Sequence, residues 1–136
     1  MNNYKHFLIF LIIFFLFNMP AFSDSLSVTM AGDVMLGSWG IEEIEKNGVD
    51  YPVALLRAEY DKSDLNMCNL EAPFTNSNDQ FPDKTYTFKV PVQYVAVLKN
   101  LNIDYVTLAN NHIMDFGTQG LLETTKTLHE NKIYYS

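Results

Sequence analysis

The sequence predicts an α/β fold in which parallel strands are joined by crossover helices. Short apolar segments rich in β-branched residues alternate with helical patterns along the 136-residue chain, and this alternation is typical of parallel sheets. The segments at 26–31, 65–70 and 103–109 each run into polar residues where the strand would end. Functional sites of α/β folds lie at such strand ends. The length allows one domain at most.

Residues 1–23 have the pattern of a secretory signal peptide. Lys5 gives a positive charge, an apolar run follows at 7–17, and Pro20 precedes small residues that end at Ser23. The run is shorter than the roughly 20 residues that span a bilayer, although an uncleaved N-terminal anchor remains the alternative. We therefore expect an exported protein, either periplasmic, extracellular or membrane-anchored at the cell surface, with its folded domain at 24–136.

The composition excludes some classes of function. With 16 acidic and 9 basic residues, the chain has a net charge of −7, which argues against nucleic-acid binding because that depends on neutralising phosphates. An anionic substrate held through a metal ion is still compatible with this charge. The single cysteine, Cys68, rules out an internal disulfide. It has no basic neighbour in sequence, so we expect a buried thiol in a strand rather than a nucleophile.

The first half of the chain predicts two strands separated by helices. Val28 and Thr29 mark the first strand, glycines mark the loop after it, and Pro52 suits a helix start. The expected elements are a strand at 26–31, a loop at 32–37, a helix at 41–46, a helix from 52 to about 60, and a strand at 65–70.

The second half continues the alternation. Asn, Asp, Ser and Pro at 75–84 indicate an exposed loop. The expected elements are a short edge strand at 86–90, a helix at 91–100, a strand at 103–109, a helix at about 119–131, and the start of a strand at 133–135. Apolar stripes predict the core faces of the two helices, and they consist of Val92, Val95, Leu98 and Leu101, and of Leu121, Leu122, Thr125 and Leu128.

Three polar clusters follow the predicted strands. Asp33 is a suitable ligand for a hard metal, or else a turn aspartate that bonds its own backbone. Asn69 and Glu71 are two residues apart in an extended segment and so share a face. Both could reach one ion, or Glu71 could bridge two ions. The alternative is that Glu71 pairs with a lysine or caps the turn before Pro73.

The third cluster offers the most varied chemistry. Asn110 and Asn111 have neutral oxygen ligands, and His112 is either a ligand or a general acid. Asp115, three residues later, could orient the imidazole and fix its tautomer. The alternative is a polar loop with an exposed histidine. Because parallel strands end side by side, we expect the three clusters to converge on one metal site.

Three other residues have side chains of a kind found in functional sites. His129 lies on the last predicted helix, away from the strand ends, so we expect a surface residue there. Trp39 and Phe116 either line the site or pack beneath it.

These motifs resemble those of a known family. GDVMLG at 32–37, NLEAP at 69–73 and ANNHIMDFG at 109–117 are similar to the motifs of CapA-like poly-γ-glutamate capsule-biosynthesis proteins, in the calcineurin-like metallophosphoesterase superfamily. FKVP at 88–91 also fits. The resemblance implies that the chain is the N-terminal half of a four-layer α/β/β/α sandwich, so that 24–136 forms an incomplete domain.

The resemblance also implies roles for individual residues. Asp33, Glu71 and Asn111 would bind two divalent metal ions (Mn, Zn, Fe or Mg), and His112 would protonate a leaving oxygen or stabilise the transition state. Glu71 would occupy the position that bridges the two ions, with Asn69 as the alternative, and Asn111 would bind the second ion. Met35 stands where the superfamily usually has a histidine, and the later histidine ligands of the superfamily would follow Ser136. We therefore expect this chain by itself to be inactive as an enzyme.

Three functions follow from the resemblance. The first is a metal-dependent hydrolase, phosphoesterase-like, that acts on an anionic capsule polymer or a phosphorylated precursor during capsule synthesis or export. The second is a non-catalytic subunit that binds or anchors the polymer, with membrane synthase subunits as partners. The third is an inactive remnant.

Overall fold

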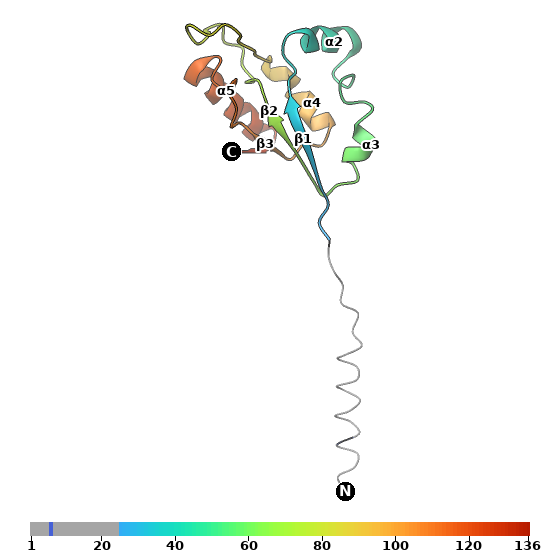
Figure 1. Cartoon of the computed structure of the whole chain (residues 1–136). Coiled ribbons are helices and arrows are strands. Elements are labelled where there is room, and N and C mark those ends of the chain that lie inside the picture. Colours follow the sequence, from blue (N-terminus) through green and yellow to red (C-terminus); the bar gives the residue numbers. More distant parts are fainter. Residues whose placement is uncertain (1–5, 7–24) are drawn as a thin grey trace.

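The computed structural model describes His6 and residues 25–136 (Figure 1). The predicted signal peptide at 1–23 therefore lies outside the described residues, His6 excepted. Within the described part of the chain, no helix has the length and apolar character needed to cross a bilayer.

A four-stranded parallel sheet forms the centre of the fold. Its strands are β1 (Val28–Val34), β2 (Leu65–Leu70), β3 (Tyr105–Thr107) and β4 (Tyr134–Tyr135), and they lie side by side in that order. Every neighbouring pair is parallel, so each connection must cross from one end of the sheet to the other. The predicted α/β class with parallel strands and crossover helices is confirmed.

Helices fill the crossovers and cover one face of the sheet. They are α2 (Trp39–Asn47), α3 (Arg57–Tyr60), the 3₁₀ helix η1 (Val92–Tyr94), α4 (Val95–Asn100) and α5 (Gly117–Glu130). In Figure 1, α4 lies behind β1 and β2. Buried residues from α2, α3, α4 and α5 form one core cluster with the buried strand residues. Because there is a single cluster, these helices pack against the same face.

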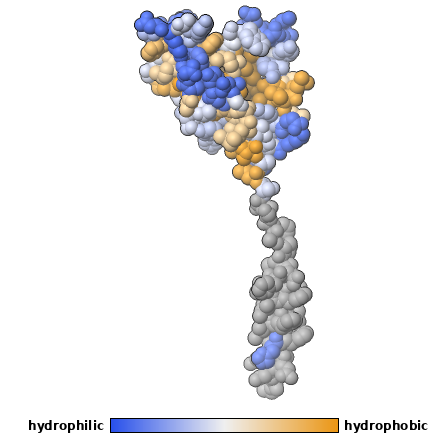
Figure 2. All heavy atoms as spheres, viewed as in Figure 1, coloured by the Kyte–Doolittle hydropathy of each residue, from blue (hydrophilic) through white to orange (hydrophobic). Residues whose placement is uncertain are grey.

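The opposite face of the sheet is open. Along β2, Asn66, Cys68 and Leu70 are buried while the alternate residues are half-exposed. Strand register places one apolar row across the open face, consisting of Met30, Met67, Tyr105 and Tyr134. Met30 and Tyr134 are 73% and 76% exposed, and Figure 2 shows hydrophobic residues over this lower part of the sheet. Such a face is what half of a sandwich offers to a second sheet.

A β-bulge in β1 decides where Asp33 lies. Met30 is paired with Met67, but the next pair is Asp33 with Asn69, so β1 has one residue more than β2 between these pairs. Without the extra residue, alternation would place Asp33 on the helix-covered face. The bulge instead places it on the open face beside Asn69. The predicted loop at 32–37 was therefore wrong at its start, because Gly32 and Asp33 belong to the strand.

Several other predicted boundaries need correction. The edge strand expected at 86–90 is only one bridge between Phe74 and Val90. The helix expected from Pro52 begins as a series of turns and becomes helical only at Arg57. The strand expected at 103–109 is a strand only over Tyr105–Thr107.

The two predicted helix faces had different outcomes. In the segment 92–101, Val95, Leu98 and Leu101 are buried as predicted. The face predicted for α5 was correct for Leu128, which is buried, and for Leu121, which packs against the core, but wrong for Leu122, which is 58% exposed. The buried positions are mostly small residues instead, Gly120, Thr124, Thr127 and Leu128. At Gly120 a Cβ atom would lie 2.8 Å from Cβ of Phe116, so only glycine fits this close approach.

Candidate metal centre at the carboxyl ends of the strands

Asn69 links the two carboxylates that end β1 and β2. Its Nδ2 donates to Oδ1 of Asp33 at 2.7 Å and to Oε2 of Glu71 at 2.5 Å. The pairing of Asp33 with Asn69 across the sheet creates this contact, and the two-residue spacing of Asn69 and Glu71 places them on one face. Two carboxylates from different strands thus share a single donor between them.

Asn110, which follows β3, fixes the orientation of that amide. Its Oδ1 accepts hydrogen bonds from the backbone N–H groups of His112 and Ile113, at 3.0 and 2.9 Å. Its Nδ2 donates to Oδ1 of Asn69 at 3.0 Å and to the carbonyl oxygen of Leu70 at 2.8 Å. With Asn110 held by four bonds, Asn69 must present its oxygen to Asn110 and its NH₂ to the carboxylates. We call Asp33, Asn69, Glu71 and Asn110 the edge network.

His112 belongs to a second network, built around a buried carboxylate. Its Nδ1 lies 2.8 Å from Oδ2 of Asp115, whose side chain is fully buried. The same oxygen accepts from the backbone N–H of Phe88 at 2.7 Å, and the Phe88 ring packs edge-on against the imidazole with centroids 4.9 Å apart. These contacts hold the ring by Nδ1 and leave Nε2 as the atom available to a substrate.

Lys84 completes this second network. Its ammonium pairs with Oδ1 of Asp115 and also donates to the backbone oxygen of Asn111. No local pattern in the sequence connects Lys84 with a carboxylate 31 positions later, so this pair could not be predicted from the sequence. We call Lys84, Phe88, His112 and Asp115 the histidine network. The backbone N–H of His112, bonded to Asn110, joins it to the edge network.

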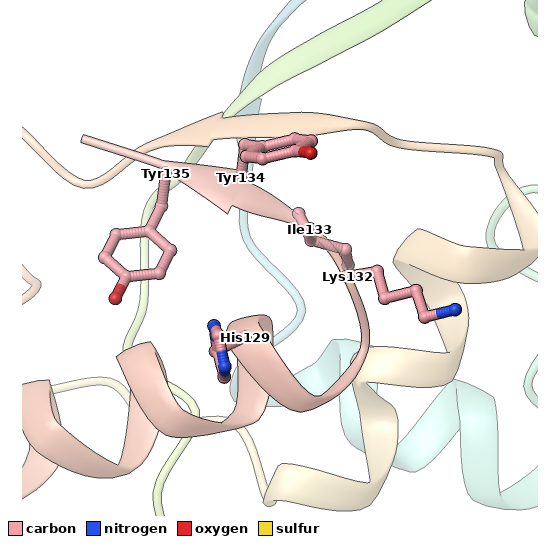
Figure 3. Close-up of a pocket in the computed structure, with 5 residues that line it drawn as sticks. All are labelled: His129, Lys132, Ile133, Tyr134 and Tyr135. Atoms are coloured by element: carbon pink, nitrogen blue, oxygen red, sulfur yellow. The ribbon is translucent and has the colours of Figure 1, made fainter.

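Other predicted residues lie apart from the two networks. Asn111 is exposed, and among the described residues its side chain makes no hydrogen bond to either carboxylate of the edge network. Trp39 is 73% exposed at the start of α2, whereas Phe116 is buried. His129 is exposed, as expected, and lines a cavity of about 350 Å³ where α5 ends and β4 begins. Figure 3 shows His129 and Tyr135 on the same side of β4, with Tyr134 on the other.

Comparison with known proteins matches the sequence to a family. The sequence profile of the bacterial capsule synthesis protein family PGA_cap covers residues 27–136. The chain belongs to this family. It is 33% identical over 102 residues to the PGA biosynthesis protein CapA of Bacillus subtilis. The aligned region covers 74% of this chain and 27% of that protein.

A second relative agrees with the first. The capsule biosynthesis protein CapA of Bacillus anthracis is 29% identical over 116 residues, which is 83% of this chain and 28% of that protein. The chain thus spans little more than a quarter of the length of either relative. The predicted resemblance to CapA-like proteins is confirmed.

The edge network of this PGA_cap chain has some of the donor groups that a divalent metal ion prefers. Asp33 and Glu71 are hard oxygen donors of the kind that Mg²⁺ and Mn²⁺ prefer, and the NH₂ group of Asn69 already lies where positive charge is favoured between them. The described residues contain no group of three His, Cys, Asp or Glu side chains close enough to hold a metal. Asp33 and Glu71 are the two carboxylate donors that the described residues bring together at this edge.

Cys68 takes no part in the site. It is buried at 4% exposure in β2, on the face that the helices cover, and is free. Burial raises the pKa of its thiol to about 12, so almost none is thiolate at neutral pH. The prediction of an inert buried thiol is confirmed.

Proposed function

We propose that this chain supplies the N-terminal part of a metal-dependent, phosphoesterase-like hydrolase that serves the synthesis or export of a poly-γ-glutamate capsule. Membership of the PGA_cap family supports the capsule role. The observation that carries the enzymatic proposal is the pair of carboxylates shared by Asn69, next to a histidine held by a buried aspartate. We propose export through residues 1–23, with an anionic polymer or a phosphorylated precursor as substrate and membrane synthase subunits as partners.

In this proposal Asp33 and Glu71 hold divalent metal, with Asn111 as a further ligand. The metal, when bound, supplies neutralisation of developing charge and activation of water. Asn69 orients both carboxylates through its two N–H bonds and is itself oriented by Asn110. These residues therefore act as a prearranged anionic end of the site.

His112 would act as the general acid that transfers a proton to the leaving oxygen. With Nδ1 held by Asp115, the neutral ring carries its proton on Nδ1 and the protonated ring carries a second one on Nε2. The Nε2 proton can pass to the leaving oxygen of a substrate, and Asp115 stabilises the ring while it is charged. Lys84 and the Phe88 N–H keep the Asp115 carboxylate in place during this step.

The experiment is an assay of Mn²⁺- or Zn²⁺-dependent cleavage of an aryl phosphate by the full-length protein. We expect Asp33→Ala and His112→Ala to abolish the cleavage, while His129→Ala, a matched histidine outside both networks, retains it. Cleavage that survives Asp33→Ala, or that needs no metal, would overturn the proposal.

A non-catalytic subunit is the second candidate. This candidate is favoured because the described residues bring only two carboxylates together at the edge. They contain no group of three His, Cys, Asp or Glu side chains that could hold a metal ion. Polymer binding by a full-length protein that cleaves no phosphoester, and that tolerates both alanine substitutions, would establish this candidate instead.

A further inference from the structure

One exposed segment between α2 and α3 is entirely apolar. It is the sequence YPVALL at 51–56, which we call the apolar turn, and all of its residues except Val53 are exposed. Leu55 is 94% exposed, and Tyr51 and Leu56 are 55% and 47% exposed. Figure 2 shows hydrophobic residues where Figure 1 draws the connection between α2 and α3. Single exposed apolar side chains are ordinary, whereas a continuous exposed run indicates contact with a partner or a membrane.

The apolar turn is held in a defined conformation. Val53 is 6% exposed and belongs to the hydrophobic core. Its carbonyl oxygen accepts from the backbone N–H groups of Leu56 and Arg57 at 2.9 and 3.1 Å. The N–H of Tyr51 donates to the carbonyl oxygen of Gly48 at 3.1 Å. The fold therefore fixes the turn at Val53 and keeps its other side chains at the surface.

The charged residues on either side of the apolar turn are paired with each other. Nη2 of Arg57 lies 3.4 Å from Oδ1 of Asp50, and Nε of Arg57 donates to the carbonyl oxygen of Asn100 at 2.8 Å. The same Asp50 oxygen accepts from Nδ2 of Asn100 at 2.6 Å. The turn can therefore approach a neutral lipid surface without burying an unpaired charge, which would be costly.

The apolar turn also lies close to the N-terminal end of the domain. Asp64 accepts from the backbone N–H and the hydroxyl of Ser27. Only α3 and the loop 61–64 lie between the turn and this contact, a path of at most about 20 Å. Residues 18–26 separate Ser27 from the apolar run at 7–17, and a chain of that length spans about 30 Å at most. A bilayer that holds the run is therefore within reach of the turn.

We propose that the apolar turn inserts into the surface of a lipid bilayer, with Leu55 deepest and Tyr51 at the level of the headgroups, where tyrosine is enriched. Two weak apolar contacts hold a protein on a membrane far more firmly than either contact alone. The run at 7–17 would be the first contact and the apolar turn the second. The proposal uses the proposed export of the domain and is independent of the metal centre.

The test places a polarity-sensitive fluorophore on the apolar turn of the full-length protein. Leu55→Cys offers an exposed thiol for the label, while Cys68 stays unlabelled because it is only 4% exposed. The labelled protein is mixed with phosphatidylcholine vesicles whose lipid tails carry a nitroxide quencher. We expect the nitroxide to reduce the emission about twofold or more, because the label enters the lipid.

Leu122→Cys is the matched control for the label. Leu122 is a leucine of α5 that is 58% exposed and lies outside the apolar turn, so we expect no quenching there. Equal quenching at both positions, or none at position 55, would overturn the proposal. A label at position 55 that is shielded from water but not quenched by the nitroxide would indicate contact with a second copy of the chain, and would overturn it too.

A charge on the apolar turn gives a second, label-free test. We expect Leu55→Glu to lower co-sedimentation of the full-length protein with phosphatidylcholine vesicles about tenfold, because a carboxylate resists insertion into lipid. Leu122→Glu adds the same charge elsewhere and should co-sediment as the parent does. If the two variants co-sediment equally, the turn is not the lipid contact. Loss of metal-dependent cleavage in other variants would leave this proposal standing, since the turn contains no residue of either network.

Discussion

Replacing Asp115 by Asn tests how the segment 81–88 is attached to the loop after β3 that carries His112. Asp115 is fully buried and accepts from Lys84, His112 and the Phe88 backbone N–H. Its own backbone oxygen also accepts from the N–H of Phe81 at 2.8 Å. An asparagine has nearly the same shape but no charge, so the substitution removes the counter-charge of Lys84 and keeps the packing.

The size of the effect follows from the burial of the pair. Removing one member of a buried ion pair costs about 3–5 kcal/mol, because the remaining charge is left uncompensated. Lys84 is 28% exposed and can recover some hydration, so we expect the lower end, about 3 kcal/mol. If the segment 81–88 opens locally, a loss of about 3 kcal/mol raises the population of its open form about 100-fold.

Limited trypsin digestion measures this opening directly. Lys84 and Lys89 are both trypsin sites in the segment that Asp115 holds, and cleavage of a transiently opened segment follows its equilibrium population when opening is fast. We expect cleavage after Lys84 to be about 100-fold faster in Asp115→Asn. Asp79→Asn, in the same loop and exposed, should change the rate less than about threefold. An Asp115→Asn rate equal to that of the control would refute the role assigned to Asp115.

Three further predictions concern other parts of the fold. Cys68 should react with a thiol reagent at pH 8 only after denaturation, since burial raises its pKa to about 12; rapid reaction of the folded protein would contradict its placement. Hydrogen bonds from Thr75, Gln119 and Asn76 lower the pKa of Glu123, so its contribution to stability is present above the unfolded pKa and is lost as pH falls through the folded pKa. In acid titrations followed by circular dichroism, Glu123→Gln should therefore depend less on pH below about 4.5 than the parent, and equal dependence would contradict the assignment. The open sheet face should bind a hydrophobic dye, and Met30→Glu should reduce dye fluorescence of the 136-residue chain, whereas unchanged fluorescence would mean that the dye binds elsewhere.

The alternation of strand and helix patterns was enough to predict the parallel sheet. The strand at Leu65–Leu70 was predicted at its observed bounds, because apolar residues and turn signals flank it clearly. The α5 face was predicted only in part, because Leu121 and Leu128 face the core as expected whereas the neighbouring buried positions are the small or polar residues Gly120, Thr124 and Thr127. Hydrophobic periodicity cannot distinguish a face buried by close approach from one exposed to water.

The members of the edge network were predictable from the sequence, whereas Asn111 lies apart from it and the connections between the members were not predictable. Polar residues after three strands indicated the edge, and the edge network does unite Asp33, Asn69, Glu71 and Asn110. The bulge that turns Asp33 to the open face depends on pairing with β2. The register of that pairing cannot be read from the sequence of either strand alone. The ion pair between Lys84 and Asp115 was equally unpredictable, because only the tertiary structure brings the two residues together.

Direct measurement of Mn²⁺ binding by calorimetry tests the central claim that the edge network holds a divalent ion. The account predicts that the full-length protein binds Mn²⁺ and that Asp33→Asn and Glu71→Gln each weaken binding by tenfold or more, while Asp79→Asn binds as the parent does. Unchanged Mn²⁺ affinity in both edge variants would contradict it.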